Sequence, residues 1–235
     1  MLGLGSSLAL GGALSGFEPS NISSLIHWWK HASGLEDAGG AFPDDDERIE
    51  VWRDSKGSND AETFDTDGSG TDAMKWDDTN KALVSDISGG FDISTLTLGS
   101  FSLYFRIQFL QAPNATDVFT QADPASTPDH NAMFISVRSP TLFRARIDST
   151  NRNFTPPTLA TGQYYNFGLE RDSSNNLRLY VDGTESSTGA LTDTTNVIID
   201  RMVCGLGDLY VTTLVFNDAL SSDDRAALET YLSNI

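Results

Sequence analysis

The chain has 235 residues, of which 39% are hydrophobic and 13 are Phe, and its formal net charge is −18. This hydrophobic content is enough for a packed core and excludes a disordered chain. A surface this acidic repels phosphate backbones and anionic lipid, which excludes nucleic acid and membrane surfaces as partners. All-β sandwiches of this length fold as one domain, so we expect a single folded domain over residues 19–235.

Residues 1–18 differ in composition from the rest of the chain. They are rich in Gly, Ala and Leu and lack a basic start, and Gly and Ser interrupt the Leu residues. We therefore expect neither a cleaved signal peptide nor a membrane span. Small residues let backbones approach closely, which is typical of an extended arm that docks on a neighbour. The candidate partner-binding residues of this arm are Leu2, Leu4, Leu8, Leu10 and Leu14.

Alternation of apolar and polar residues predicts many short strands after the arm. The predicted strands are 25–30, 49–53, 74–76, 82–84, 101–109, 133–137, 142–147, 197–204 and 209–216. The clearest is 101–109, whose five large apolar residues fall on one face. The segments 32–48, 111–131 and 149–163 are predicted to be long loops and are the expected carriers of function.

A β-hairpin is predicted over residues 167–184. Phe167 and Leu169 alternate with polar or small residues before the turn, and Leu177, Leu179 and Val181 do so after it. The pattern indicates one buried and one exposed face on each strand. The turn at 172–176 contains Asp, Ser and Asn, whose side chains bond to their own backbone.

The C-terminal segment predicts the one helix of the chain. Ser221 to Asp224 resembles a capping box, and acidic residues are favourable in a first helical turn. The fold class expected is therefore all-β, a two-sheet antiparallel jelly-roll sandwich with a short C-terminal helix. The single cysteine, Cys204, allows no internal disulfide, and we expect it to be a buried apolar residue in a chain that matures in a reducing cell.

Three segments resemble one known family. Residues 52–61 (WRDSKGSNDA), 162–183 (which ends in LRLYVDG) and 217–229 (NDALSSDDRAALE) are similar to motifs of the concanavalin A-like lectin/glucanase superfamily, in its laminin G-like branch. The resemblance covers about residues 20–235. The arm resembles the start of virion structural proteins of tailed bacteriophages, including cyanophages.

These resemblances imply a virion structural protein, such as a capsid decoration, fibre or tail-appendage component. It would be made in the host cytoplasm and displayed on the virion surface. Its partners would be other virion proteins and sister subunits, with the protein forming a homo-oligomer. The alternative is a carbohydrate-binding adhesin that recognises host-surface glycan and depends on calcium.

Enzymatic activity is not expected from the sequence. A retaining glycosidase needs two carboxyl groups about 5 Å apart, and the family's Glu-x-Asp-x-x-Glu string is absent. The nearest pairs, Glu47 with Glu50 and Glu170 with Asp172, are predicted to be solvated acids at strand edges. The histidines, His27, His31 and His130, lie in no nucleophile motif. We therefore predict a non-enzymatic protein with no catalytic residues.

No cofactor is required by these motifs, and calcium is the candidate ligand. Asp65, Asp67 and Asp72 alternate with Gly in DTDGSGTD, and carboxylates in a sharp turn suit Ca²⁺. The acids at 44–47 form a second candidate, and both segments are equally consistent with exposed acidic turns.

Sugar binding needs an exposed aromatic ring with Asp, Asn and backbone groups beside it. The candidate rings are Trp28, Trp29, Trp52, Trp76 and Tyr210. The fold places Trp52 and at least one of Trp28 and Trp29 in the core, and the sequence leaves open which ring is exposed.

Overall fold

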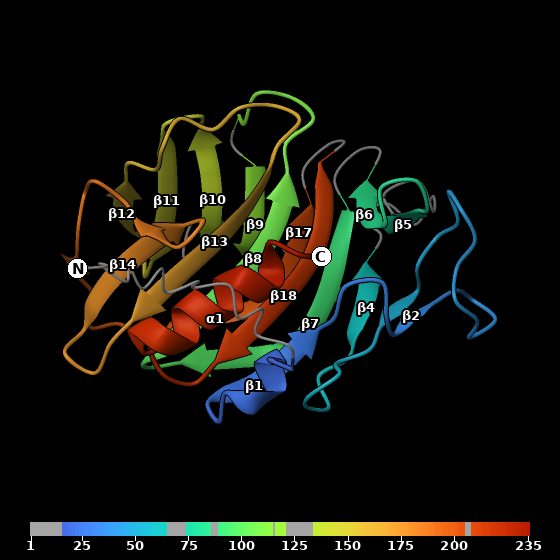
Figure 1. Ribbon diagram of the computed structural model, residues 1–235, viewed down its shortest axis with the longest axis horizontal. Helices are drawn as coiled ribbons and strands as arrows, with labels where there is room; N and C mark the ends of the chain where they lie inside the picture. The colour runs from blue at the N-terminus through green and yellow to red at the C-terminus, as the bar shows by residue number, and fades with distance from the viewer. Residues whose placement is uncertain (1–15, 65–73, 86–88, 115, 121–133, 205–207) are drawn as a thin grey trace, which may run out of the picture.

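The computed structural model of the protein is a sandwich of two antiparallel sheets with one helix packed outside it (Figure 1). It describes residues 16–64, 74–85, 89–114, 116–120, 134–204 and 208–235. The arm leucines and the candidate calcium ligands Asp65, Asp67 and Asp72 lie outside the described residues, as do His130 and the side chain of Cys204. No helix among the described residues is long and apolar enough to span a membrane.

The first sheet, sheet A, has the strand order β15-β14-β13-β8-β18-β6-β5, with β1 also paired to β18 and β16 to β14. The bounds of these strands are β1 Leu25–Trp29, β5 Met74–Asp77, β6 Ala82–Ser85, β8 Phe101–Gln108, β13 Tyr164–Arg171, β14 Asn176–Val181, β15 Thr184–Glu185, β16 Leu191–Thr192 and β18 Leu209–Phe216.

The second sheet, sheet B, has the order β12-β11-β10-β9-β17-β7-β4-β3-β2. Its strands are β2 Leu35–Glu36, β3 Val51–Trp52, β4 Ala61–Phe64, β7 Gly89–Leu98, β9 Thr116–Thr120, β10 Phe134–Ser139, β11 Leu142–Ile147, β12 Thr150–Phe154 and β17 Val197–Cys204. A short 3₁₀ helix, η1 Pro19–Asn21, precedes β1.

The main hydrophobic core fills the space between the sheets. Strand β8 contributes the five-residue apolar row predicted from the sequence, and Phe101, Phe105 and Phe109 from this row are fully buried. Phe105 stacks on Phe167 of β13, with ring centroids 5.1 Å apart. The predicted all-β sandwich is thus confirmed, with 142–147, 197–204 and 209–216 as strands at the predicted bounds.

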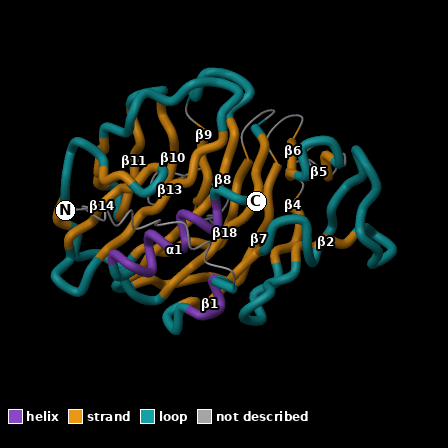
Figure 2. The backbone as a smooth tube through the Cα atoms, viewed as in Figure 1, coloured by secondary structure: helices purple, strands orange, loops and turns teal. Residues whose placement is uncertain are grey.

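The C-terminal helix, α1 Ser222–Leu232, covers the outer face of sheet A (Figures 1 and 2). Ser221 caps it, because the Ser221 side chain accepts a hydrogen bond from the Asp224 N–H at 3.1 Å. Leu228 and Leu232 of α1 share a second apolar cluster with Tyr104 of the sheet and Trp28 of β1. This outer cluster buries strands on the side that faces away from the main core.

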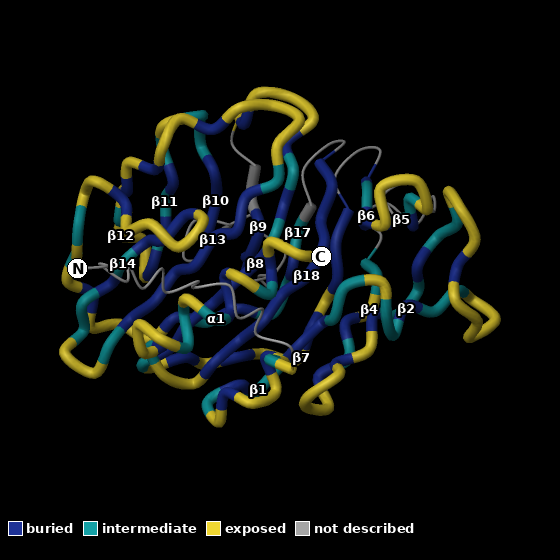
Figure 3. Tube along the Cα trace, viewed as in Figure 1, coloured by how far each residue is buried: buried dark blue, intermediate teal, exposed yellow. Residues whose placement is uncertain are grey.

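The hairpin prediction needs a correction for this reason. Its strands are β13 and β14, as expected, but Gly168 and Glu170 are buried rather than exposed. A Cβ on Gly168 would lie 2.5 Å from the Tyr104 ring, so only glycine fits there. Figure 3 shows the strands behind α1 buried along their length. The helix closes the face that the alternation assigned to solvent.

Besides the short strands β2, β4, β15 and β16, three longer strands lie where the sequence pattern indicated loops or gave no signal. β7 alternates imperfectly because its register with β17 shifts near Ile199. β12 is a polar edge strand, buried only at Phe154, and lies in the predicted loop 149–163. β9 lies in the predicted loop 111–131.

A buried polar cluster fixes α1 to sheet A. Glu170 accepts hydrogen bonds from Tyr104 (2.6 Å) and from Arg225 of α1 (2.8 Å to the Nη2). Glu229 of α1 accepts from Asn166 of β13 at 2.9 Å. Burial raises the pKa of Glu229 to about 7, and the nearby Asp182 carboxylate adds to this rise. The helix is therefore held by one ion pair and one carboxyl group that prefers to be protonated.

Glu229→Gln should stabilise the protein in a pH-dependent way. The folded-state pKa of Glu229 is raised, so ionising it costs stability as pH rises from about 4.5 through 7. We expect no gain at pH 5 and a gain on the order of 2 to 3 kcal/mol at pH 8, measured by urea unfolding. Asp223→Asn, exposed on the same helix, is the control. Equal gains for Glu229→Gln at both pH values would contradict this account.

Candidate functional site

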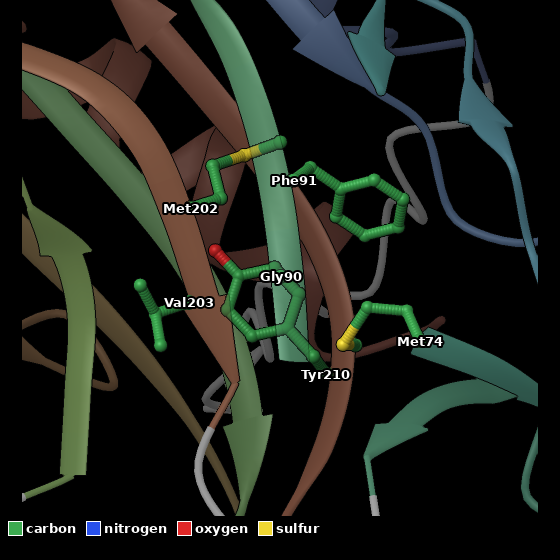
Figure 4. A pocket seen from close by; sticks show the side chains of 6 residues that line it. All are labelled: Met74, Gly90, Phe91, Met202, Val203 and Tyr210. Carbon is green, nitrogen blue, oxygen red and sulfur yellow. The ribbon is translucent and has the colours of Figure 1, made fainter. Parts of the chain in front are cut away.

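A small cavity lies between the sheets, lined by Met74, Gly90, Phe91, Met202, Val203 and Tyr210 from β5, β7, β17 and β18 (Figure 4). Its volume is about 10 Å³, and it is lined by apolar groups. A space of this size holds at most about one water molecule. It is a packing gap in the core and is too small for a ligand.

A larger, polar groove lies at the β5–β6 end of the molecule. Its volume is about 360 Å³, and we call it the acidic groove. Its walls are formed by Asp45, Asp46, Trp76, Asp77, Thr79, Asn80 and Val84. Figure 1 places β5 and β6 at one end of the long axis, and Figure 3 shows exposed loops around them. Unlike the core cavity, this groove combines room for a ligand with several polar side chains.

Backbone pairing holds the two walls of the acidic groove together. The Asp46 N–H donates to the Trp76 carbonyl at 2.8 Å, and the Trp76 N–H donates to the Glu47 carbonyl at 3.0 Å. The Asp45 carboxylate accepts from the Asp78 N–H at 2.9 Å. These bonds hold the segment after Phe42 antiparallel to β5, so Asp45 and Asp46 are held at fixed positions.

The polar groups of the groove keep hydrogen-bonding capacity. Asp77 accepts from the backbone and side-chain nitrogens of Asn80 at 2.8 and 2.7 Å, and Asp46 accepts from Lys75 at 3.1 Å. An ionised carboxylate has about four acceptor positions, so these bonds leave positions free. Together with the Thr79 hydroxyl and the Asn80 amide, the groove offers both acceptors and donors to a polyhydroxylated ligand.

Phe42 supplies an exposed ring beside the acidic groove. Its side chain is 49% exposed, and it packs edge to face on Trp76 with ring centroids 5.3 Å apart. Trp76 itself is 2% exposed, so the accessible aromatic surface here belongs to Phe42. An exposed ring next to hydroxyl-binding groups is the arrangement that sugar sites use.

The loop that carries Phe42 is anchored at its base. The Asp37 carboxylate accepts from the backbone of Gly39 (2.7 Å) and Ala41 (2.9 Å), which closes the turn. Before it, Glu36 of β2 pairs with Arg53, which also contacts Asp60. The position of the Phe42 ring therefore depends on the segment around residue 53.

A buried carboxylate, Asp54, organises that segment. It accepts hydrogen bonds from His27 Nδ1 (2.6 Å) and from the backbone N–H groups of Trp28, Lys56, Gly57 and Asn59. Burial raises the pKa of Asp54, but these bonds outweigh burial and hold the pKa well below its usual value. Asn59 in turn bonds to Ser94 of β7. The motif WRDSKGSNDA thus ties β1 of sheet A to β7 of sheet B.

Asp54→Asn should destabilise the protein strongly at neutral pH. Because the pKa of Asp54 is lower in the folded than in the unfolded protein, its ionised form stabilises the fold at any pH above the pKa of the unfolded state. This contribution is lost as the pH falls below about 4. We expect a loss of about 2 to 4 kcal/mol at pH 7, because a buried charged partner is removed, and a smaller loss at pH 3. Asp37→Asn, in an exposed turn, is the control for urea unfolding at both pH values. A loss that does not shrink at pH 3 would contradict this role.

Gly57→Ala tests the packing around the same Asp54 contact by adding one methyl group. A Cβ at residue 57 would lie 2.6 Å from Asp54 Oδ2 and 2.8 Å from His27 Nδ1. We expect the thermal midpoint to fall by several degrees, whereas Gly99→Ala, which meets no atom within 4 Å and like Gly57 has no positive φ, should change it little. Equal losses for Gly57→Ala and Gly99→Ala would count against the tight packing.

The aromatic residues nominated from the sequence do not form the site. Trp28, Trp29, Trp52, Trp76 and Tyr210 are each at most 4% exposed. The core assignment of Trp52 is confirmed, but none of the five rings is open to solvent. Sequence analysis missed Phe42, and the available signal was a lone aromatic between Ala41 and Pro43 in an acidic loop with no strand pattern.

The acids at 44–47 frame the groove rather than gather as a ligand cluster. Within the described part of the chain, no three His, Cys, Asp or Glu side chains lie together as a group that could hold a metal ion. Glu47 accepts from the Asp44 N–H at 2.6 Å and so closes its own turn. The calcium prediction for Asp65, Asp67 and Asp72 stays a prediction.

The sequence prediction for Glu170 was wrong. It is 3% exposed and paired under α1, whereas a solvated edge acid was expected. The physical cause is again the helix, which covers this face of sheet A. His27, in contrast, has its partners within the fold, because it bonds to Asp54 and stacks on Trp29.

Comparisons with known proteins show the fold. No protein-family model and no curated protein sequence matches the chain. Among solved structures, Trypanosoma rangeli sialidase matches with a TM-score of 0.59 and 14% identity, over 89% of this chain and 33% of that one. A structure described as "Cell entry of botulinum neurotoxin type C is dependent upon interaction with two ganglioside molecules" matches with a TM-score of 0.61 and 12% identity, over 92% of this chain and 53% of that one.

A third structure is the binding domain of botulinum neurotoxin DC in complex with rat synaptotagmin II, with a TM-score of 0.58 and 10% identity over 89% and 52% of the two chains. The chain therefore spans about one third of the sialidase and about half of the toxin chains. The fold is a lectin-like β-sandwich.

The sialidase structures correct one prediction. The sequence-based exclusion of an enzyme is contradicted, because several of the matched structures are enzymes that share this sandwich. The missing glucanase carboxylate string excludes one chemistry and does not exclude a place in an enzyme. At 14% identity, the likeness establishes architecture, and no sialidase residue is transferred to this chain.

Proposed function

We propose that the protein is a carbohydrate-binding domain of the concanavalin A-like, laminin G-like type, and that it binds sugar in the acidic groove. One observation carries this proposal: the exposed Phe42 ring stands beside a groove of about 360 Å³ lined by Asp, Thr and Asn. The ring offers a stacking face, and Asp45, Thr79 and Asn80 offer hydrogen bonds to hydroxyl groups.

The electrostatics of the groove favour an uncharged sugar. Three aspartates line it, in a chain with a formal net charge of −18, so an anionic ligand is repelled there. Matched structures support the binding role in general terms, since one description names sialic acid as the bound molecule and another names gangliosides. For this chain, we propose a neutral glycan of a host cell surface.

A glycan array with variants tests the groove. We expect Phe42→Ala to lower the affinity for the bound neutral glycan by about tenfold or more, because a stacking ring contributes roughly 1.5 kcal/mol. Asn80→Ala should also weaken binding. Leu110→Ala is the matched control, because Leu110 is the other large hydrophobic residue exposed among the described residues, at 47%. Binding by Phe42→Ala that equals wild type would refute the groove, as would the absence of any neutral glycan from the array hits.

The same array with EDTA tests calcium at Asp65, Asp67 and Asp72. We expect loss of glycan binding with EDTA and its return with added Ca²⁺, since carboxylate oxygens are the ligands this ion prefers. Binding that is indifferent to EDTA would remove calcium from the account while leaving the groove in place.

We also propose that the domain is displayed on a virion, which rests on the resemblance of residues 1–18 to the start of tailed-phage structural proteins. The arm would dock on the particle or on sister subunits through its leucines. Deleting residues 1–15 should abolish incorporation into particles while leaving the unfolding midpoint of the sandwich unchanged, because Phe17, which packs on Tyr231 of α1, is retained. Unchanged incorporation of the truncated chain would refute docking by the arm.

A further inference from the structure

The outer face of sheet B at β10–β12 carries a basic surface, at the opposite end of the long axis from the acidic groove (Figure 1). Along β11, Phe143, Ala145 and Ile147 point into the core. Arg144 and Arg146 alternate with them and therefore lie on the outer face. This surface, which we call the arginine face, is a local reversal of the acidic charge of the chain.

Neighbouring strands place uncharged side chains opposite the two arginines, of which only those of β12 are exposed. In the ladder, Arg144 stands directly opposite Asn153 of β12 and Ser136 of β10. Arg146 stands opposite Asn151 of β12 and Phe134 of β10. Asn151 and Asn153 are exposed. The arginine face thus offers two guanidinium groups flanked by amides on one side.

The carboxylates that the structure describes form no ion pair with the guanidinium groups of the arginine face. Neither Arg144 nor Arg146 forms an ion pair with a carboxylate of the described residues, unlike Arg53, Arg178 and Arg225 elsewhere in the structure. Arg144 Nε donates to the Asn153 side-chain oxygen at 2.8 Å. Arg146 donates no hydrogen bond to a described group and lies over the Phe134 ring, 5.9 Å from its centroid. Arg146 Nε is buried without a described partner and Arg144 Nε is bonded to Asn153, so the terminal Nη groups of the two half-buried arginines are the donors left for a ligand.

We propose that the arginine face binds a single acidic group, a carboxylate or a sulfate, carried by a sugar whose hydroxyls contact Asn151 and Asn153. Guanidinium groups recognise carboxylate and sulfate oxygens through paired hydrogen bonds. An extended polyanion such as nucleic acid is disfavoured, because the formal net charge of −18 repels charges beyond this small surface. The amides suit hydroxyl groups, which favours an acidic sugar over a bare anion.

This inference extends the carbohydrate-binding function but uses a different surface and a different ligand charge from the groove. Calorimetry on the full chain tests this inference with three probes that share the lactose disaccharide: lactose, sialyllactose and sulfated lactose. We expect both acidic probes to bind at least about tenfold more tightly than lactose, with affinity falling as NaCl is raised. A preference for only one of them would identify the acid as carboxylate or sulfate.

Substitutions at the arginine face test whether its residues cause the preference for acidic probes over lactose. Arg144→Gln with Arg146→Gln should bring the affinities for the acidic probes down to that for lactose. Arg178→Gln is the control for the loss of a positive charge elsewhere on the protein, because Arg178 is paired with Asp172 and Glu185. If the double variant unfolds, Asn151→Ala with Asn153→Ala provides a milder test and should lower the affinity for both acidic probes.

Three results would overturn the proposal. These are the absence of binding by either acidic probe, equal affinity for lactose and the acidic probes, and an acid preference that survives the double arginine change. The Phe42→Ala variant separates this test from that of the groove, since it should leave the acid preference unchanged. Loss of acid preference in Phe42→Ala would place the acidic ligand in the groove and would also overturn the arginine face.

Discussion

The buried carboxylate of Asp54 is the constraint on which this end of the molecule depends. Two stacked sheets are held together by apolar burial, which is not directional, whereas Asp54 fixes their register with directed hydrogen bonds. It joins β1 of sheet A to the segment that leads into β4 of sheet B. Through Arg53 and Glu36 the same segment anchors the loop that presents Phe42. A structural contact thus sets the geometry of a candidate binding surface.

The C-terminal helix imposes a second constraint. By covering sheet A it turns β8 and β13 into strands buried on both faces, and it therefore requires polar groups on those strands to find partners. Glu170, Tyr104 and Arg225 satisfy one another. Glu229 is satisfied less well, because one of its oxygens has no hydrogen-bond partner among the described residues. Helix docking should accordingly be the part of the fold most sensitive to pH near neutrality.

Strand positions were predictable wherever packing obeyed a simple alternation. The row Phe101, Phe105 and Phe109 and the strand at 142–147 lie where the period-two pattern predicted them. Prediction failed where a register shift disturbed the phase, as in β7, and where an edge strand had little to bury, as in β12. It also failed for Glu170, since alternation along a strand carries no information about a helix that arrives from 50 residues away.

The candidate site was less predictable than the fold. The sequence indicated aromatic residues and acids as sugar-binding groups, but the five nominated rings are buried, because a sandwich of this size needs them for its core. Phe42 is exposed because it lies in a loop whose hydrogen bonds are internal, and no periodic pattern reports such a loop. The basic surface at β11 was equally hard to predict, since a negative net charge of the whole chain gives no indication of a local excess of positive charge.

Opposite charge at the two ends of the sandwich is the central feature of the account, with neutral sugar assigned to the acidic groove and acidic sugar to the arginine face. The most direct test is a set of ¹H–¹⁵N NMR titrations of the full chain with lactose, sialyllactose and the neutral glycan that ranks highest on the array. The account predicts saturable shifts at residues 42–46 and 76–80 for the neutral glycan, and shifts at 144–153 for sialyllactose. Shifts at the arginine face with the neutral glycan, or none at residues 42–46 and 76–80, would contradict it.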